Sequence, residues 1–148
     1  MDDKKSANQL VTMLEDWFKK LPPLPTNAVD TIAKITPILA LVFGILGVLL
    51  SVAGLGILSF LAPFAMMSGA APHYGFGMIA TVGWLISSVM MLLAYPGLKA
   101  GKTSGWNMLF WSEVVNVATS LLGFNLGSVI GALIGFYLLF QIKPKFRG

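Results

Sequence analysis

Glu113 is the residue of this sequence whose position most directly predicts chemistry. It is the only ionisable residue that falls inside a predicted membrane span, and a carboxylate in hydrocarbon is energetically costly. Asn116 and Ser120 follow at spacings of three and seven residues, so all three side chains share one helix face. We expect that face to point inward. Glu113 then takes up a proton or cation, holds helices together as a protonated acid, or lies in a water-filled crevice without a role.

The other residues whose side chains could bind a metal or take part in catalysis form no convincing site. The sequence has no cysteine, which excludes disulfides and thiolate metal ligands. His73 is the single histidine and has no second ligand for zinc, so an ordinary loop position is expected. The sequence Gly101-Lys-Thr lacks the earlier glycine of a Walker A loop. We therefore expect no metal, no cofactor and no enzymatic activity.

The composition predicts that these residues are positioned by membrane-spanning helices. Hydrophobic residues make up 56% of the 148 residues and charged residues only 11%. No Asp, Glu, Lys or Arg occurs from Ile35 to Leu98, which is room for two crossings of about 20 residues and a turn. The expected fold class is all-α, an integral membrane four-helix bundle with an N-terminal amphipathic interfacial helix.

The distribution of basic residues predicts the topology. The expected spans are about 37–59, 78–95, 106–122 and 128–142. All ten Lys and Arg residues then lie before the first span, between the second and third, or after the fourth, which places both termini in the cytoplasm and the protein in the cell membrane. A fifth crossing within 35–77 would move Lys99 and Lys102 to the opposite side and is rejected. A re-entrant segment at 57–72 stays open.

The N-terminal part is predicted to lie at the cytoplasmic boundary. Residues 1–27 form an amphipathic helix and a proline-rich connector, and residues 28–148 form the membrane domain. The sequence Ser6-Ala-Asn-Gln9 has the form of a capping box that would begin the helix. Trp17 and Phe18 are expected at the membrane interface. The helix lies either among the lipid headgroups or beneath the protein itself.

Small residues form two stripes at helical spacing. The stripes are Ala40, Gly44, Gly47, Ser51 and Gly54 in the first span, and Gly127, Gly131 and Gly135 in the fourth. Small side chains let two helix backbones approach closely, so both stripes predict tight helix packing. The partner is another helix of the same chain or another subunit, and spacing alone does not decide between them.

Two segments carry a resemblance. The block from Tyr95 to Trp106 and the ending from Gly131 to Lys143 resemble small uncharacterised bacterial membrane proteins with four predicted spans. This resemblance implies an architecture and transfers no activity. Tyr95 and Trp106 themselves are expected to anchor the inner membrane interface.

These patterns favour a non-enzymatic multispan membrane protein that acts by helix packing. Its expected partners are the lipid bilayer and either further copies of itself or another membrane protein. The alternative is a small proton- or cation-coupled transporter or channel that uses Glu113. Nucleic acid is not expected as a partner, because the basic residues are scattered rather than gathered into a patch with interleaved aromatics.

Overall fold

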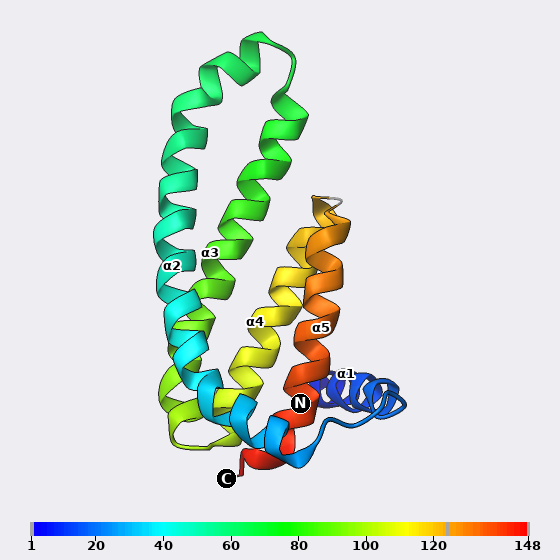
Figure 1. Ribbon diagram of the computed structural model, residues 1–148. Coiled ribbons are helices and arrows are strands. Elements are labelled where there is room, and N and C mark those ends of the chain that lie inside the picture. Colours follow the sequence, from blue (N-terminus) through cyan, green and yellow to red (C-terminus); the bar gives the residue numbers. More distant parts are fainter. Residues whose placement is uncertain (1, 124, 148) are drawn as a thin grey trace.

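In the computed structural model, which describes residues 2–123 and 125–147, the chain is helical and the all-α prediction is confirmed. The elements are α1 (Asp2–Phe18), α2 (Thr26–Met67), α3 (Ala71–Lys99), α4 (Thr103–Leu122), α5 (Leu126–Ile142) and the short 3₁₀ helix η1 (Lys143–Lys145). Figure 1 shows a long α2/α3 hairpin beside a shorter α4/α5 hairpin, with α1 next to the lower end of α5. Both termini lie at that lower end.

Three segments of the described chain are long and apolar enough to cross a membrane: Thr26–Met67, Ala71–Lys99 and Leu126–Lys145. This indicates a membrane protein, as the composition predicted. The 20-residue helix α4 is not among the three. It contains Glu113, two asparagines and several hydroxyl residues, which make it more polar than its neighbours.

Helix α2 is much longer than the predicted first span of 37–59. Its 42 residues correspond to about 63 Å at 1.5 Å per residue, and they pass Pro37 and Pro63 without ending. Both prolines therefore lie within the helix. Figure 1 shows that the helix bends in its first third and again near its upper end. Of the segment 57–72 considered as re-entrant, residues 57–67 belong to α2 itself.

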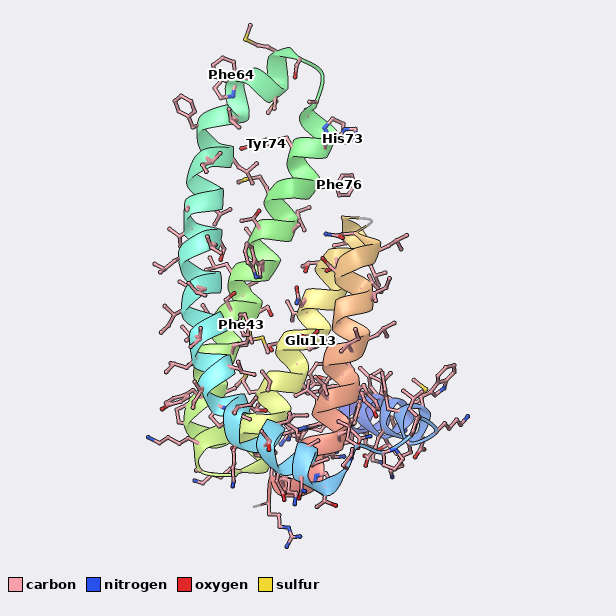
Figure 2. All side chains as sticks on the ribbon, viewed as in Figure 1. Phe43, Phe64, His73, Tyr74, Phe76 and Glu113 are labelled. Carbon is pink, nitrogen blue, oxygen red and sulfur yellow. The ribbon has the colours of Figure 1, made fainter. Side chains whose placement is uncertain are left out.

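The turn between α2 and α3 is also shorter than the segment 60–77 that the predicted spans left between them. It comprises only residues 68–70, and Gly69 takes the left-handed conformation at φ 75°. Pro72 is accommodated in the first turn of α3, where its missing N–H would have no helical partner. The upper end of this hairpin extends beyond the α4–α5 turn and exposes large apolar side chains such as Phe64 (Figure 2).

The small residues of α2 pack directly against α3. A Cβ added at Gly44 would lie 2.6 Å from Leu92 Cδ2, and one added at Gly47 would overlap Ser88. Ala40 and Ser51 of the same stripe are fully buried. The partner of this stripe is therefore a helix of the same chain.

Glycines also bring α3 and α4 together, and these contacts were not predicted. A Cβ at Gly97 would lie 2.7 Å from both the Cα and the N of Gly105. Higher in the same pair, Gly83 leaves space that Thr119 fills. Between these points Ser87 Oγ donates a hydrogen bond to the Ser112 carbonyl oxygen at 2.9 Å. The packing of α3 against α4 therefore joins the two hairpins.

The best-packed part of the core is an aromatic cluster at the lower end of the molecule. Trp106 is fully buried, stacks on Phe110 with ring centroids 5.5 Å apart, and donates from Nε1 to the Leu139 carbonyl oxygen at 2.7 Å. The prediction that Trp106 anchors the membrane interface is therefore wrong. The tight Gly97–Gly105 crossing lets this side chain, which follows Gly105 directly, enter the interior.

Helix α1 joins this cluster from outside. Phe18 stacks on Phe140 of α5 with ring centroids 5.4 Å apart, whereas Trp17 is 71% exposed. The two residues therefore point in different directions, as adjacent helix positions do. The structure supports packing of α1 against the protein itself. The helix also begins at Asp2, so the predicted capping box at Ser6 does not mark its start.

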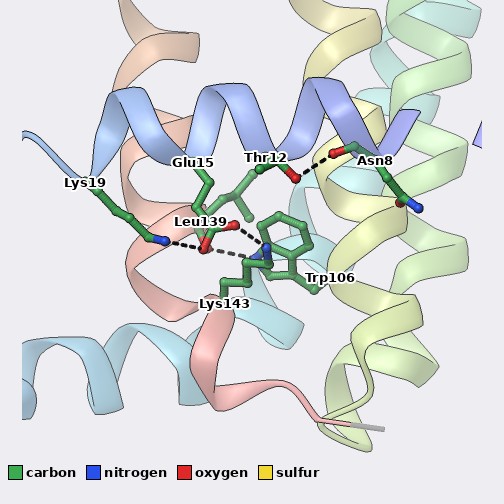
Figure 3. A network of polar contacts seen from close by, with 7 residues as sticks. All are labelled: Asn8, Thr12, Glu15, Lys19, Trp106, Leu139 and Lys143. Atoms are coloured by element: carbon green, nitrogen blue, oxygen red, sulfur yellow. Dashed lines mark hydrogen bonds and ion pairs between the residues drawn. The ribbon is translucent and has the colours of Figure 1, made fainter. Parts of the chain in front are cut away.

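Polar contacts hold the N-terminal part to α5 and to η1, which follows α5 directly. Lys143 Nζ lies 2.5 Å from Glu15 Oε2, and Lys19 lies 3.4 Å from Oε1 (Figure 3). Partial burial alone would raise the pKa of Glu15, but the hydrogen bond and charge of Lys143, with help from Lys19, lower it below its ordinary value. Tyr137 also donates to the Pro22 carbonyl oxygen at 2.5 Å. The proline-rich connector is thereby fixed to the bundle.

Candidate functional site

Glu113 lies half-buried on α4, and its carboxyl group faces α5. A Cβ added at Gly135 would lie 3.0 Å from Glu113 Oε1, so the absence of a side chain at that position makes room for the carboxyl group. Glu113 is thus placed between the two helices of the shorter hairpin. Its position depends on a glycine of the predicted α5 stripe.

A cavity of about 1160 Å³ begins at Glu113 and extends between the two hairpins. Its walls come mainly from α3, α4 and α5, with Phe43 contributed by α2. We call this space the Glu113 cleft. Asn116 and Ser120 line it together with Glu113, so the three residues that spacing placed on one helix face do open onto one space.

Several polar groups of the cleft present hydrogen-bond acceptors, beside the N–H donors of Asn116 and Trp84. The hydroxyls of Thr81, Thr119 and Ser120 each donate to a carbonyl of their own helix, at 2.8 to 3.0 Å. A hydroxyl has only one proton to donate, so the oxygen lone pairs remain available as acceptors. Asn116 adds an amide oxygen, and Glu113 adds a carboxyl group. This chemistry suits a cation, a proton or a donor-rich ligand.

His73 also lines the cleft, although the sequence placed it in a loop. It lies in the first turn of α3, on the side toward the upper end of the molecule (Figure 2). Gly77, Thr81 and Trp84 follow it along the same helix and line the same cleft. Their spacing of four, four and three residues is a helical signal. It was missed because the second span was predicted to begin at residue 78.

The α5 stripe makes little contact with the other helices of this chain. A Cβ added at Gly131 would meet nothing within 4 Å, and one at Gly127 would meet only Asn125 Oδ1, at 3.6 Å. Gly131 instead lines the cleft. Two of the three glycines therefore leave open space, and only Gly135 contacts another helix of this chain.

The remaining predicted interface residue, Tyr95, is half-buried near the lower end of α3, with Lys99 Nζ 5.9 Å from its ring centroid. In residues 2–123 and 125–147 no group of three or more His, Cys, Asp or Glu side chains is arranged to hold a metal ion. No protein-family model matches this sequence, and no curated protein or solved structure matches the chain.

Proposed function

We propose that this protein is an integral membrane four-helix bundle in which α2, α3, α4 and α5 each cross the bilayer. Helix α4 is the most polar of the four, but its 20 residues reach about 30 Å, which matches the hydrocarbon thickness. The α3–α4 turn and both termini lie at one end of the molecule (Figure 1). Every lysine and the arginine lie in the N-terminal part, at the start of α2, at the α3–α4 turn or in the C-terminal segment. This distribution favours a cytoplasmic location for that end of the molecule.

We further propose that the Glu113 cleft binds and releases a proton or a small cation, and that the protein acts as a transporter or channel. The observation that carries this proposal is that one cavity contains Glu113 together with the acceptor oxygens of Asn116, Thr119 and Ser120. An acid that only tied helices together would be enclosed by them, whereas Glu113, although its carboxyl group lies against α5, also lines a cavity of about 1160 Å³.

Flux measurements test this function. The full chain is reconstituted in liposomes that contain a pH-sensitive dye, and proton movement is followed under gradients of Na⁺ or K⁺. We expect Glu113→Gln to reduce the rate at least tenfold. Asp16→Asn makes a similar change on the exposed side of α1 and should leave the rate unchanged. Absence of flux in the unmodified protein, or an equal rate in Glu113→Gln, would exclude the proposal.

A second candidate function is assembly with another copy through α5. Gly127 has open space where a partner helix could approach, and the neighbouring Ile130 and Leu133 are more than half exposed. We expect Gly127→Leu to convert a dimer to a monomer, measured by native mass spectrometry of the detergent-solubilised protein. The control is Gly56→Leu, because a Cβ at Gly56 meets nothing within 4 Å. A monomeric unmodified protein would exclude this candidate.

A further inference from the structure

A second cavity, separate from the Glu113 cleft, lies at the lower end of the molecule. Its volume is about 590 Å³, it is open on one side, and it is lined by the first turns of α2, the last turns of α3 and the C-terminal segment around η1. We call it the basic pocket. Its charged and aromatic lining residues are Asp30, Lys34, Tyr95, Lys99, Lys145 and Phe146.

The charges of the basic pocket are unbalanced. Asp30 is paired with Lys145, whose Nζ lies 2.5 Å from Asp30 Oδ1. Within the described part of the chain, no carboxylate lies within ion-pair distance of Lys34 or Lys99. Two ammonium groups thus remain for an anion, and the Tyr95 hydroxyl adds a possible donor. The pocket favours a negatively charged group.

The other walls of the basic pocket are apolar. Pro37 and Leu98 are buried beside it, and Ile38 lines it while remaining 60% exposed. From this point α2 continues as a helix without charged residues. An occupant that reached out of the pocket along Ile38 would therefore enter the zone where hydrocarbon surrounds the helices. Free phosphate would use the lysines but not this apolar wall.

We infer that the basic pocket binds the phosphate-bearing headgroup of an anionic phospholipid, with Lys34 and Lys99 contacting the phosphate and the acyl chains following Ile38. Basic pockets between membrane helices on the cytoplasmic side commonly bind such headgroups. In this position the lipid would contact the start of α2, the end of α3 and the C-terminal segment together. Its binding should therefore stabilise the packing of these three parts.

Binding measurements on the full detergent-solubilised chain test this inference. Native mass spectrometry and thermal unfolding are recorded with phosphatidylglycerol, with phosphatidylcholine and with inorganic phosphate. We expect phosphatidylglycerol to bind at least tenfold more tightly than phosphatidylcholine and to raise the unfolding temperature, with no effect of inorganic phosphate at equal concentration. Equal binding of both lipids, or an equal effect of inorganic phosphate, would overturn the inference.

Two pairs of substitutions then locate the site. Lys34→Gln combined with Lys99→Gln should weaken phosphatidylglycerol binding about fivefold or more per lysine. Lys4→Gln combined with Lys102→Gln removes the same charge from exposed positions outside the pocket and should leave binding within twofold. The conservative pair Lys34→Arg and Lys99→Arg should retain binding. Equal losses in the first two variants would indicate attraction to net charge and would overturn the assignment.

Discussion

Gly97→Ala should destabilise the protein at the crossing of α3 and α4. The added Cβ would lie 2.7 Å from the Cα and N of Gly105 and 3.3 Å from Ser104 Oγ. Ordinary contacts begin near 3.4 Å, so the backbones must separate by about 0.7 Å. Both opposing Gly105 atoms are backbone, and a rotamer change cannot relieve the overlap. Such overpacking costs about 1–3 kcal/mol.

The expected loss of stability in Gly97→Ala is therefore about 1–3 kcal/mol, measured as the free energy of unfolding in an SDS titration of the detergent-solubilised protein. The matched control is Gly56→Ala, which makes the same change in a helix where the new Cβ meets nothing. Gly97→Ala combined with Gly105→Ala should lose less than the sum of the single losses, because both act on one contact.

Three outcomes of these measurements test the close approach of α3 and α4 at Gly97 and Gly105. A Gly97→Ala protein as stable as the Gly56→Ala protein would refute the close approach of α3 and α4. Strictly additive losses at Gly97 and Gly105 would show that the two glycines do not share a contact. A large loss in both Gly97→Ala and Gly56→Ala would point to a general effect of substitution in membrane helices instead.

Two further changes test the lower end of the molecule. Because the pKa of Glu15 is lowered from 4.5, its ion pair with Lys143 stabilises the protein above about pH 4.5 and is lost as the pH falls through the lower folded-state value. Glu15→Gln should therefore reduce stability by up to about 1 kcal/mol near neutral pH and converge with the unmodified protein in acid, as measured by thermal unfolding across pH. Trp106→Phe removes the buried hydrogen bond to Leu139 and should cost about 1–3 kcal/mol in an SDS titration.

Controls for these two changes come from neighbouring residues. Asp16→Asn alters an exposed acid next to Glu15 and should leave stability nearly unchanged; a loss as large as that of Glu15→Gln would contradict the role of Lys143. Trp17→Phe changes an exposed indole and should leave stability nearly unchanged. Losses of similar size at Trp17 and Trp106 would argue against a special place for Trp106 in the core.

Several features of this protein were determined by sequence alone because they depend on local spacing. The long absence of charge predicted apolar helices, and three such segments are present. The shared face of Glu113, Asn116 and Ser120 follows from 3.6 residues per turn, whatever else surrounds the helix. The helix boundaries were less predictable, since α2 bends and continues through Pro37 and Pro63 instead of ending there (Figure 1).

Only the tertiary structure decided which faces meet. An aromatic residue beside a basic turn has the same local sequence whether it faces the interface or the core, and the Gly97–Gly105 crossing directs Trp106 inward. The small residues of α2 and α5 have similar spacing, yet α3 covers the first stripe while Gly131 opens onto the cleft. His73 joins Glu113 in that cleft because helix pairing brings together residues forty positions apart. Such long-range pairing is fixed by the packing of whole helices, which no local pattern records.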